Sequence, residues 1–269
     1  MAQSNSDITA AVFKMVSYNL RGLNSGRGLL STLCNDPEIA IIAVQEHWLT
    51  PNNLHLLNTV HPEFVGFGIS AMNKKLDSGI YSGRPFGGVG FLWRKCFSKL
   101  IRVINGDDNG RCLCISIDRI GSSPLKLINV YFPCQSSNFQ YTVELGNCLG
   151  YIENVMLPSE DVIIMGDMNF TCTADNAGFL QCKNVLDRFS IAHCDDFCLA
   201  PNTATYVNDS LKTASFIDHY FISNSIRLNL NKIVIIDSGA NLRLTGLELG
   251  SAYLPCQCVI QCASGPLPP

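Results

Sequence analysis

The stretch Val162-Ile-Ile-Met-Gly-Asp-Met-Asn169 decides the fold, because an apolar run ends there abruptly in a carboxylate and an amide. Consecutive apolar residues bounded by glycine predict a strand that is buried on both faces. If the extended conformation continues past Gly166, the period of two places Asp167 and Asn169 on one face. They would then lie at the carboxyl end of a core strand, where open α/β sheets bind ligands. The alternative is a strand followed by an Asx turn.

Composition describes a globular chain of 269 residues, of which 47% are hydrophobic and 15% are charged. The charged fraction is well below the roughly 25% of an average protein, and the length suffices for one large core. Because the net charge is -3, any contact with nucleic acid has to come from a local basic patch. No run approaches the ~18 apolar residues of a membrane span, and Met1 to Asp7 lacks a signal-peptide pattern. We expect an intracellular protein with no membrane partner.

Thirteen scattered cysteines do not form a zinc-binding pattern in the sequence. No CxxC pair recurs, and the densest group, His193-Cys194-Asp-Asp-Phe-Cys198, has no second cluster at zinc-ligand spacing. We therefore expect buried free thiols in a reducing compartment. The isolated histidines His55, His61 and His193 are expected at the surface or in the core.

The hydrophobic pattern predicts strands and helices that together form one domain of residues 12–262, between a disordered leader (1–11) and a tail (263–269). Strands are expected over 12–19, 39–44, 87–93, 100–104, 111–117, 125–131, 162–165, 216–222, 232–237 and 257–261. Helices are expected over 28–34, 53–60, 138–157 and 177–189, and a polar, hairpin-like loop over 202–215.

Polar side chains gather at the ends of these predicted strands. They are Asn19, Glu46, Tyr131, Asp167 and Asn169, and Asp218 interrupts a late apolar strand. Each alone is most simply a cap or a turn, but together they supply hard oxygen ligands and hydrogen-bonding groups. Such a set favours Mg²⁺ and an anionic substrate over Zn²⁺.

Five segments, in this order, resemble the endonuclease/exonuclease/phosphatase superfamily. They are Ser17-Tyr-Asn-Leu-Arg-Gly22, Val44-Gln-Glu-His47, Asn129-Val-Tyr-Phe-Pro133, Gly166-Asp-Met-Asn169 and Ser215-Phe-Ile-Asp-His219. Residues 83–93 and 237–241 look most like the endonuclease domain of LINE-type non-LTR retrotransposons. The resemblance implies an α/β fold, a four-layer sandwich of two packed mixed β-sheets with helices on the outer faces.

The resemblance also implies a phosphodiesterase that depends on Mg²⁺ or Mn²⁺. Glu46 and Asn19 would bind the metal, and Asp167 would align or deprotonate the attacking water. Asn169 and Tyr131 would donate hydrogen bonds to phosphate oxygens as charge builds there.

The substrate implied by the resemblance is DNA, nicked by an endonuclease. Asp218 stands where the superfamily has an aspartate near the catalytic centre. Substrate contacts are expected from Arg21 and from the loop residues Thr205, Tyr206 and Lys212. A protein active on DNA in this way would be nuclear.

The chain departs from the superfamily pattern near its C-terminus. Where relatives have Ser-Asp-His before Leu-Pro, this chain has Ser251, Ala252 and Tyr253, preceded by residues 243–250, which we interpret as extra sequence. His219 does not replace the histidine, because alternation points it away from the Asp218 face. Loss of a general acid or base costs ~10² to 10⁴ in rate. The competing hypothesis is thus a catalytically impaired pseudo-endonuclease that binds nucleic acid or protein. A phosphatase or sphingomyelinase of the same superfamily is a third.

Overall fold

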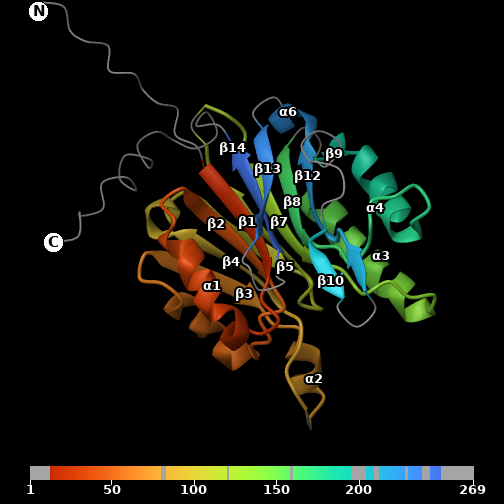
Figure 1. Cartoon of the computed structure of the whole chain (residues 1–269), viewed down its shortest axis with the longest axis horizontal. Coiled ribbons are helices and arrows are strands. Elements are labelled where there is room, and N and C mark those ends of the chain that lie inside the picture. Colours follow the sequence, from red (N-terminus) through yellow and green to blue (C-terminus); the bar gives the residue numbers. More distant parts are fainter. Residues whose placement is uncertain are drawn as a thin grey trace, which may run out of the picture.

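Two six-stranded sheets pack face to face in the computed structural model of the chain (Figure 1). The structure describes residues 13–79, 83–119, 121–157, 160–194, 204–208, 212–227, 230–237 and 243–249. The predicted leader, the tail and the strand over 257–261 lie outside the described residues.

The first sheet has the strand order β13-β14-β1-β2-β4-β3. Its strands are β13 (Leu230–Asp237), β14 (Arg243–Leu249), β1 (Phe13–Asn19), β2 (Ile39–Gln45), β4 (Val89–Arg94) and β3 (Phe64–Ile69). β1 and β2 run parallel, with Asn19 opposite Gln45, whereas the other neighbours are antiparallel. The chain therefore leaves β1 after Asn19 and β2 after Gln45 at the same end of the sheet, which we call the edge that carries the polar residues.

The second sheet has the order β5-β6-β7-β8-β12-β9. Its strands are β5 (Ile101–Gly106), β6 (Cys112–Ile117), β7 (Leu125–Tyr131), β8 (Asp161–Asp167), β12 (Asp218–Ser223) and β9 (Ile191–His193). Here β7 and β8 are the parallel pair, with Tyr131 opposite Asp167. Each sheet thus has one parallel pair whose carboxyl ends carry polar residues.

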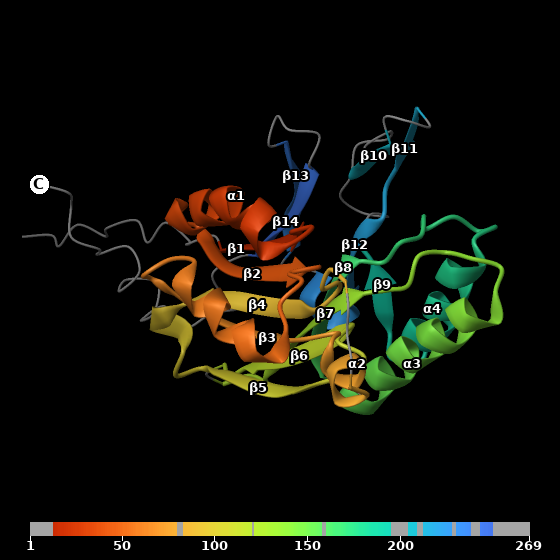
Figure 2. The ribbon, with the colours of Figure 1, turned by 90° about the horizontal axis from the view of Figure 1, so that it is seen from below.

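Helices cover the outer face of each sheet, which gives four layers (Figure 2). The helices are α1 (Leu23–Asn35), α2 (Asn73–Asp77), α3 (Phe139–Val155), α4 (Ala177–Asp187) and α6 (Asn224–Arg227), with 3-10 turns η1 (Pro51–Thr59) and η2 (Lys95–Phe97). One apolar core lies between the sheets, a second lies beneath α1, and a third lies beneath α3 and α4. The predicted four-layer α/β sandwich is confirmed. No helix among the described residues is long and apolar enough to cross a membrane.

The strand β14 corrects the interpretation of residues 243–250 as extra sequence. It pairs with both β1 and β13 in the interior of the first sheet. The pattern did not predict it because Gly246 stands between Leu244 and Leu247, so that the apolar alternation is broken.

The strand β3 was also missed by the sequence pattern, since two glycines dilute its apolar residues. A Cβ at Gly66 would come within 2.7 Å of the Leu57 backbone, so η1 packs against this strand only because the side chain is absent. The close packing that requires glycine is therefore the same feature that concealed the strand.

The expectation of free cysteines holds for most, but not all, of the described positions. Eight described cysteines are not disulfide-bonded: Cys34, Cys112, Cys114, Cys148, Cys182 and Cys194 are buried as expected, whereas Cys172 is half-buried and Cys134 is exposed. Cys96 is disulfide-bonded, so the expectation is wrong there.

Candidate active site

The predicted polar residues meet where the carboxyl ends of the two parallel pairs face each other. Asn19 ends β1 and Glu46 follows β2 in the first sheet, while Tyr131 ends β7 and Asp167 ends β8 in the second. Asp218 begins β12 and lies opposite Asp167 in the antiparallel β8–β12 ladder. One edge of the sandwich therefore collects groups that are up to 199 positions apart in the chain, from Asn19 to Asp218.

The Asn19 amide joins the two sheets at this edge. Its Nδ2 donates to Glu46 Oε1 at 2.7 Å and to Asp167 Oδ2 at 2.8 Å. Its Oδ1 accepts a hydrogen bond from the Arg21 backbone N–H at 3.1 Å. Both ends of the amide are engaged, which holds a carboxylate of each sheet against the other.

Glu46 is held in an uncommon backbone conformation. Its φ is +52°, in the left-handed region that residues other than glycine rarely adopt. The Gly22 N–H donates to the Glu46 carbonyl at 2.7 Å, and Trp48 Nε1 donates to Glu46 Oε2 at 3.1 Å. Strain of this kind persists where the surroundings determine the conformation, and it clusters at functional sites.

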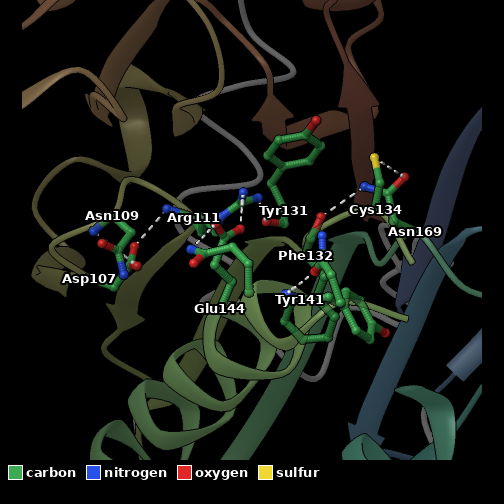
Figure 3. A network of polar contacts seen from close by, with 11 residues as sticks. Asp107, Asn109, Arg111, Tyr131, Phe132, Cys134, Tyr141, Glu144 and Asn169 are labelled. Atoms are coloured by element: carbon green, nitrogen blue, oxygen red, sulfur yellow. Dashed lines mark hydrogen bonds and ion pairs between the residues drawn. The ribbon is translucent and has the colours of Figure 1, made fainter. Parts of the chain in front are cut away.

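The turn after β8 brings Asn169 to the same edge by a route that the sequence did not predict. The extended conformation does not continue to Asn169, because its φ is +52°. The Asn169 N–H donates to Asp167 Oδ1 at 3.0 Å, which forms the Asx turn that was the alternative interpretation. Asn169 Nδ2 then donates to the Phe132 carbonyl at 2.8 Å, next to Tyr131 (Figure 3).

Tyr131 is fixed by its neighbours on both sides. Arg111 donates to the Tyr131 carbonyl at 3.2 Å, lies 5.5 Å from the centre of its ring, and is itself held by Glu144 at 2.6 Å (Figure 3). Burial, followed by the charges of Glu46 and Asp167, raises the pKa of the Tyr131 phenol. The phenol therefore stays protonated at neutral pH and can donate a hydrogen bond.

Two buried carboxylates face each other at this edge. Burial raises the pKa of Asp167 to about 6, with a further increase from Glu46, while hydrogen bonds from Asn19 and Asn169 oppose the shift. Burial and the charge of Asp167 raise the pKa of Asp218. The site therefore concentrates negative charge that its own hydrogen bonds compensate only in part.

Thr205 has a different place from the one that the sequence predicted. Its side chain is buried, and its hydroxyl oxygen accepts from the Ile217 N–H at 3.1 Å and from the Asp218 N–H at 3.3 Å. The same hydroxyl hydrogen-bonds the Asp218 carboxylate. Thr205 therefore positions Asp218 instead of presenting a surface to a substrate.

The hairpin of β10 (Tyr206–Asn208) and β11 (Thr213–Ser215) stands out from the sandwich beside this edge (Figure 2). The Arg21 guanidinium lies 5.4 Å from the centre of the Tyr206 ring. Lys212 is exposed just before β11, with a φ of +52°. Arg21 and Tyr206 are thus near each other, whereas Lys212 lies at the other end of the β10–β11 ladder, in which Tyr206 pairs with Ser215.

Sequence reasoning missed several residues that support the site. Gln45 Nε2 donates to Asn129 Oδ1 at 2.7 Å between the sheets, and Asn129 Nδ2 donates to the Val44 and Gly90 carbonyls. Asn129 is a lone amide in the apolar stretch 125–131, which was the available signal. Trp48 and Arg111 had no comparable signal, because their roles depend on contacts with distant segments.

The predicted C-terminal positions Ala252 and Tyr253 lie outside the described residues. β14 runs antiparallel to β1, with Thr245 opposite Ser17 and Leu249 opposite Phe13. The strand therefore reaches the Asn19 edge of the sheet at Arg243 and the opposite edge at Leu249. The sequence between β13 and β14, residues 238–242, reads Ser-Gly-Ala-Asn-Leu and contains neither histidine nor aspartate.

The donor set at this edge fits a hard divalent cation. Carboxylate oxygens of Glu46, Asp167 and Asp218 converge there. The pKa values of the two aspartates are raised because their negative charge is incompletely compensated, and a bound cation would compensate it. Asn19 presents its amide nitrogen, so in this arrangement it bridges the carboxylates. Its predicted role as a metal ligand stays a prediction.

Comparison with known proteins places the chain in a family. The sequence profile described as the Endonuclease/Exonuclease/phosphatase family matches residues 16–236. No curated protein matches by sequence.

Solved structures share the fold at low sequence identity. An AP endonuclease from Leishmania major has a TM-score of 0.72 at 12% identity, covering 93% of this chain and 91% of that one. A 3' phosphatase from Neisseria, solved with a product DNA hairpin, has a TM-score of 0.66 at 15% identity and covers 88% and 99%. The endonuclease domain of TRAS1, a telomere-specific non-LTR retrotransposon, has a TM-score of 0.64 at 13% identity and covers 90% and 100%.

Proposed function

Because the chain belongs to the Endonuclease/Exonuclease/phosphatase family, we propose that it is a metal-dependent phosphodiesterase that nicks DNA. The observation that carries this proposal is the Asn19 amide, which holds Glu46 of one sheet and Asp167 of the other within hydrogen-bonding distance of a single nitrogen. The edge where they meet has three carboxylates and a protonated phenol at the ends of core strands. This is a suitable set for activating water against a phosphodiester.

Each residue at this edge has a step that its geometry permits. Mg²⁺ or Mn²⁺, held by Glu46 with help from Asn19, would polarise the scissile phosphate and stabilise the leaving oxygen. Asp167, with a pKa of about 6, is ionised above that pH and accepts a proton from the attacking water. Asn169 and Tyr131 donate hydrogen bonds to the phosphate oxygens as charge develops.

DNA would approach over the hairpin of β10 and β11. Arg21 and Lys212 supply positive charge there, and Tyr206 supplies an aromatic face to a chain whose net charge is -3. The likeness in fold to the TRAS1 endonuclease domain supports, at 13% identity, the finer proposal of a retrotransposon-derived nicking enzyme. A nuclear location follows from that role.

The second candidate function is a catalytically impaired pseudo-endonuclease that binds nucleic acid or protein. The observation in its favour is that neither residues 238–242 nor Ser251 to Tyr253 contains the Ser-Asp-His motif of the family resemblance. The carboxylate residues and the hairpin of β10 and β11 would then bind nucleic acid or protein without cleaving it.

Plasmid nicking in Mg²⁺ and Mn²⁺ separates the two functions. For an enzyme, Glu46→Gln abolishes nicking, whereas the matched change Glu63→Gln, on the segment before β3, leaves it intact. Nicking that survives in Glu46→Gln would contradict the proposed site.

If the unmodified chain does not nick, two double variants locate the defect. Ala252→Asp with Tyr253→His restores Ser-Asp-His before Leu254-Pro255, and Ala240→Asp with Asn241→His places an Asp-His pair, preceded by glycine, between β13 and β14. Nicking gained by either variant shows that the metal-binding residues are intact and that the chain lacks only the histidine. If neither variant nicks the plasmid but the chain binds DNA, the result supports the function of a binding module.

A further inference from the structure

Three side chains from separate segments converge on the face of the second sheet that lies opposite to the Asp218 side chain. They are Cys172 in the turn after β8, His193 at the end of β9 and His219 in β12, and one potential ligand atom of each lies within 4.8 Å of the other two. His193 Nε2 and His219 Nδ1 are 3.1 Å apart. None of the described residues of the candidate active site, which we call the carboxylate edge after Glu46, Asp167 and Asp218, belongs to this cluster.

The neighbours of His219 determine which of its nitrogens is available. His219 Nε2 lies 2.9 Å from the Phe170 carbonyl, which only accepts hydrogen bonds, so Nε2 carries the proton. Nδ1 therefore presents its lone pair toward His193 and Cys172. A histidine whose distal N–H is bound by a backbone carbonyl is the usual arrangement around a bound metal.

The distances suit one tetrahedral ion. At zinc, two imidazole nitrogens are about 3.3 Å apart and a nitrogen and a thiolate sulfur about 3.6 Å, from Zn–N and Zn–S bonds of about 2.05 and 2.3 Å. The His193–His219 separation of 3.1 Å is close to the first value, and the Cys172 sulfur, within 4.8 Å of both nitrogens, has to move by at most about 1.2 Å toward them.

The surroundings favour a soft ion over Mg²⁺. The rings of Phe216 and Phe221 lie 4.8 Å from the His219 and His193 rings respectively, and that of Phe170 stacks on His219 at 6.1 Å. Imidazole and thiolate ligands in such a setting select zinc. A cavity of about 350 Å³ is lined by His193 and Phe221, so one of the three side chains borders open space.

We propose that Cys172, His193 and His219 bind one Zn²⁺ ion and supply three of its four tetrahedral ligands. The Cys172 thiol loses its proton to solvent when the ion binds, and the His193 proton moves to Nδ1 so that Nε2 can coordinate. The ion joins β9 and the turn after β8 to β12, the strand whose first residue is Asp218. This zinc site is independent of whether the carboxylate edge cleaves DNA.

The competing interpretation is a hydrogen-bonded histidine pair within an aromatic core. In that case His193 Nε2–H donates to His219 Nδ1, and Cys172 is a neighbouring thiol with no part in metal binding. Direct measurement of metal binding separates the two, because the histidine pair does not require a thiolate.

Cobalt titration of the full chain, freed of metal by dialysis against a chelator, tests the proposal. With excess Mg²⁺ present to occupy the carboxylates of the candidate active site, we expect one equivalent of Co²⁺ per chain with a thiolate-to-cobalt charge-transfer band that Zn²⁺ abolishes. Cys172→Ser removes the band and weakens binding more than tenfold, and His193→Gln weakens it by about the same factor. The exposed Cys134→Ser is the matched control and keeps the band.

Thermal unfolding shows whether each variant is folded. Zn²⁺ at a hundredfold excess over its Kd raises the Tm of the unmodified chain by about 5 to 10 °C, and this shift is lost in Cys172→Ser even though the variant unfolds cooperatively. An unchanged band in Cys172→Ser, or less than half an equivalent of cobalt bound to the unmodified chain, overturns the proposal.

Discussion

The two faces of β12 carry opposite chemistry, although the residues concerned are adjacent in the chain. Asp218 points to the carboxylate edge, where Asp167 lies beside it and the Thr205 hydroxyl holds it. His219 points to the helix-covered face, among aromatic rings and beside His193. One strand thus borders a set of hard oxygen donors on one side and a set of soft nitrogen and sulfur donors on the other.

The difference shows that the neighbours of a strand, more than the strand itself, determine which ion suits each face. The oxygen donors come from residues at strand ends, where the chain is partly open to solvent and an anionic substrate can approach. The nitrogen and sulfur donors come from β9, β12 and the turn after β8, where an ion stiffens the fold.

The largest effect is expected from Asp167→Asn. It removes the carboxylate that accepts the proton of the attacking water, so nicking should fall by ~10² to 10⁴. Cobalt binding at Cys172 and the histidines should stay unchanged, because Asp167 faces the other side of the sheet. The measurements are plasmid nicking and the cobalt titration, and a loss of both would mean that the faces are not independent.

Gly166→Ala is expected to damage both faces together. A Cβ there would lie 2.0 Å from the Val130 carbonyl oxygen, and the φ of +146° is unfavourable for alanine. We expect the free energy of unfolding to fall by at least about 3 kcal/mol, which lowers Tm by about 6 to 12 °C. Gly146→Ala on α3, where a Cβ meets nothing within 4 Å, is the control and should stabilise by up to ~1 kcal/mol.

Gly166 also illustrates what the sequence could and could not predict. The apolar run before it predicts a buried strand, which the structure confirms. The polar residues after it predict a site at the strand's end, where the structure brings Asp167 together with Asn19 and Glu46. The conformation of Asn169 was not predictable, because an Asx turn and a continued strand have the same sequence pattern. Only the contacts with Phe132 and Asp167 decide between them.

The histidine and cysteine cluster could not be predicted from the pattern of residues at all. Zinc sites are recognised in sequence by short, regular spacings, and Cys172, His193 and His219 come from three segments 21 and 26 residues apart. Alternation did predict that His219 faces away from Asp218, and the structure confirms it. What His219 meets on that face depends on how β9 pairs with β12, which is a property of the folded sheet.

A smaller effect is expected from Asp167→Asn on stability. The pKa of Asp167 is raised from 3.8 to about 6 in the folded chain, so its contribution to stability is fully present below pH ~3.8 and is lost as pH rises through about 6. Without divalent metal, the variant should therefore be more stable than the unmodified chain at pH 7.5, by about 1 to 2 kcal/mol once the lost hydrogen bond is subtracted.

Urea unfolding in a chelator at pH 4 and at pH 7.5 measures this difference. The advantage of the variant should be small at pH 4, where Asp167 is protonated in the folded chain and close to half protonated in the unfolded chain. If the variant and the unmodified chain have equal free energies of unfolding at both pH values, the ionised carboxylate is fully compensated by Asn19 and Asn169. Cys172→Ser, on the other face, should show no such dependence on pH in the same range.

The smallest effect is expected from Lys212→Ala, which tests which face of β12 meets DNA. Lys212 is exposed at the hairpin beside the carboxylate edge, whereas Lys183 is exposed on α4 and lines the cavity next to His193. If DNA lies over the hairpin, Lys212→Ala should weaken binding less than about tenfold at every sequence and reduce the slope of log K against log salt by about 1. Lys183→Ala should change neither quantity, because its side chain is on the face that the proposed zinc ion stabilises. A reduced slope in Lys183→Ala, with no change in Lys212→Ala, would place the nucleic acid on the helical side and leave the carboxylates without their substrate.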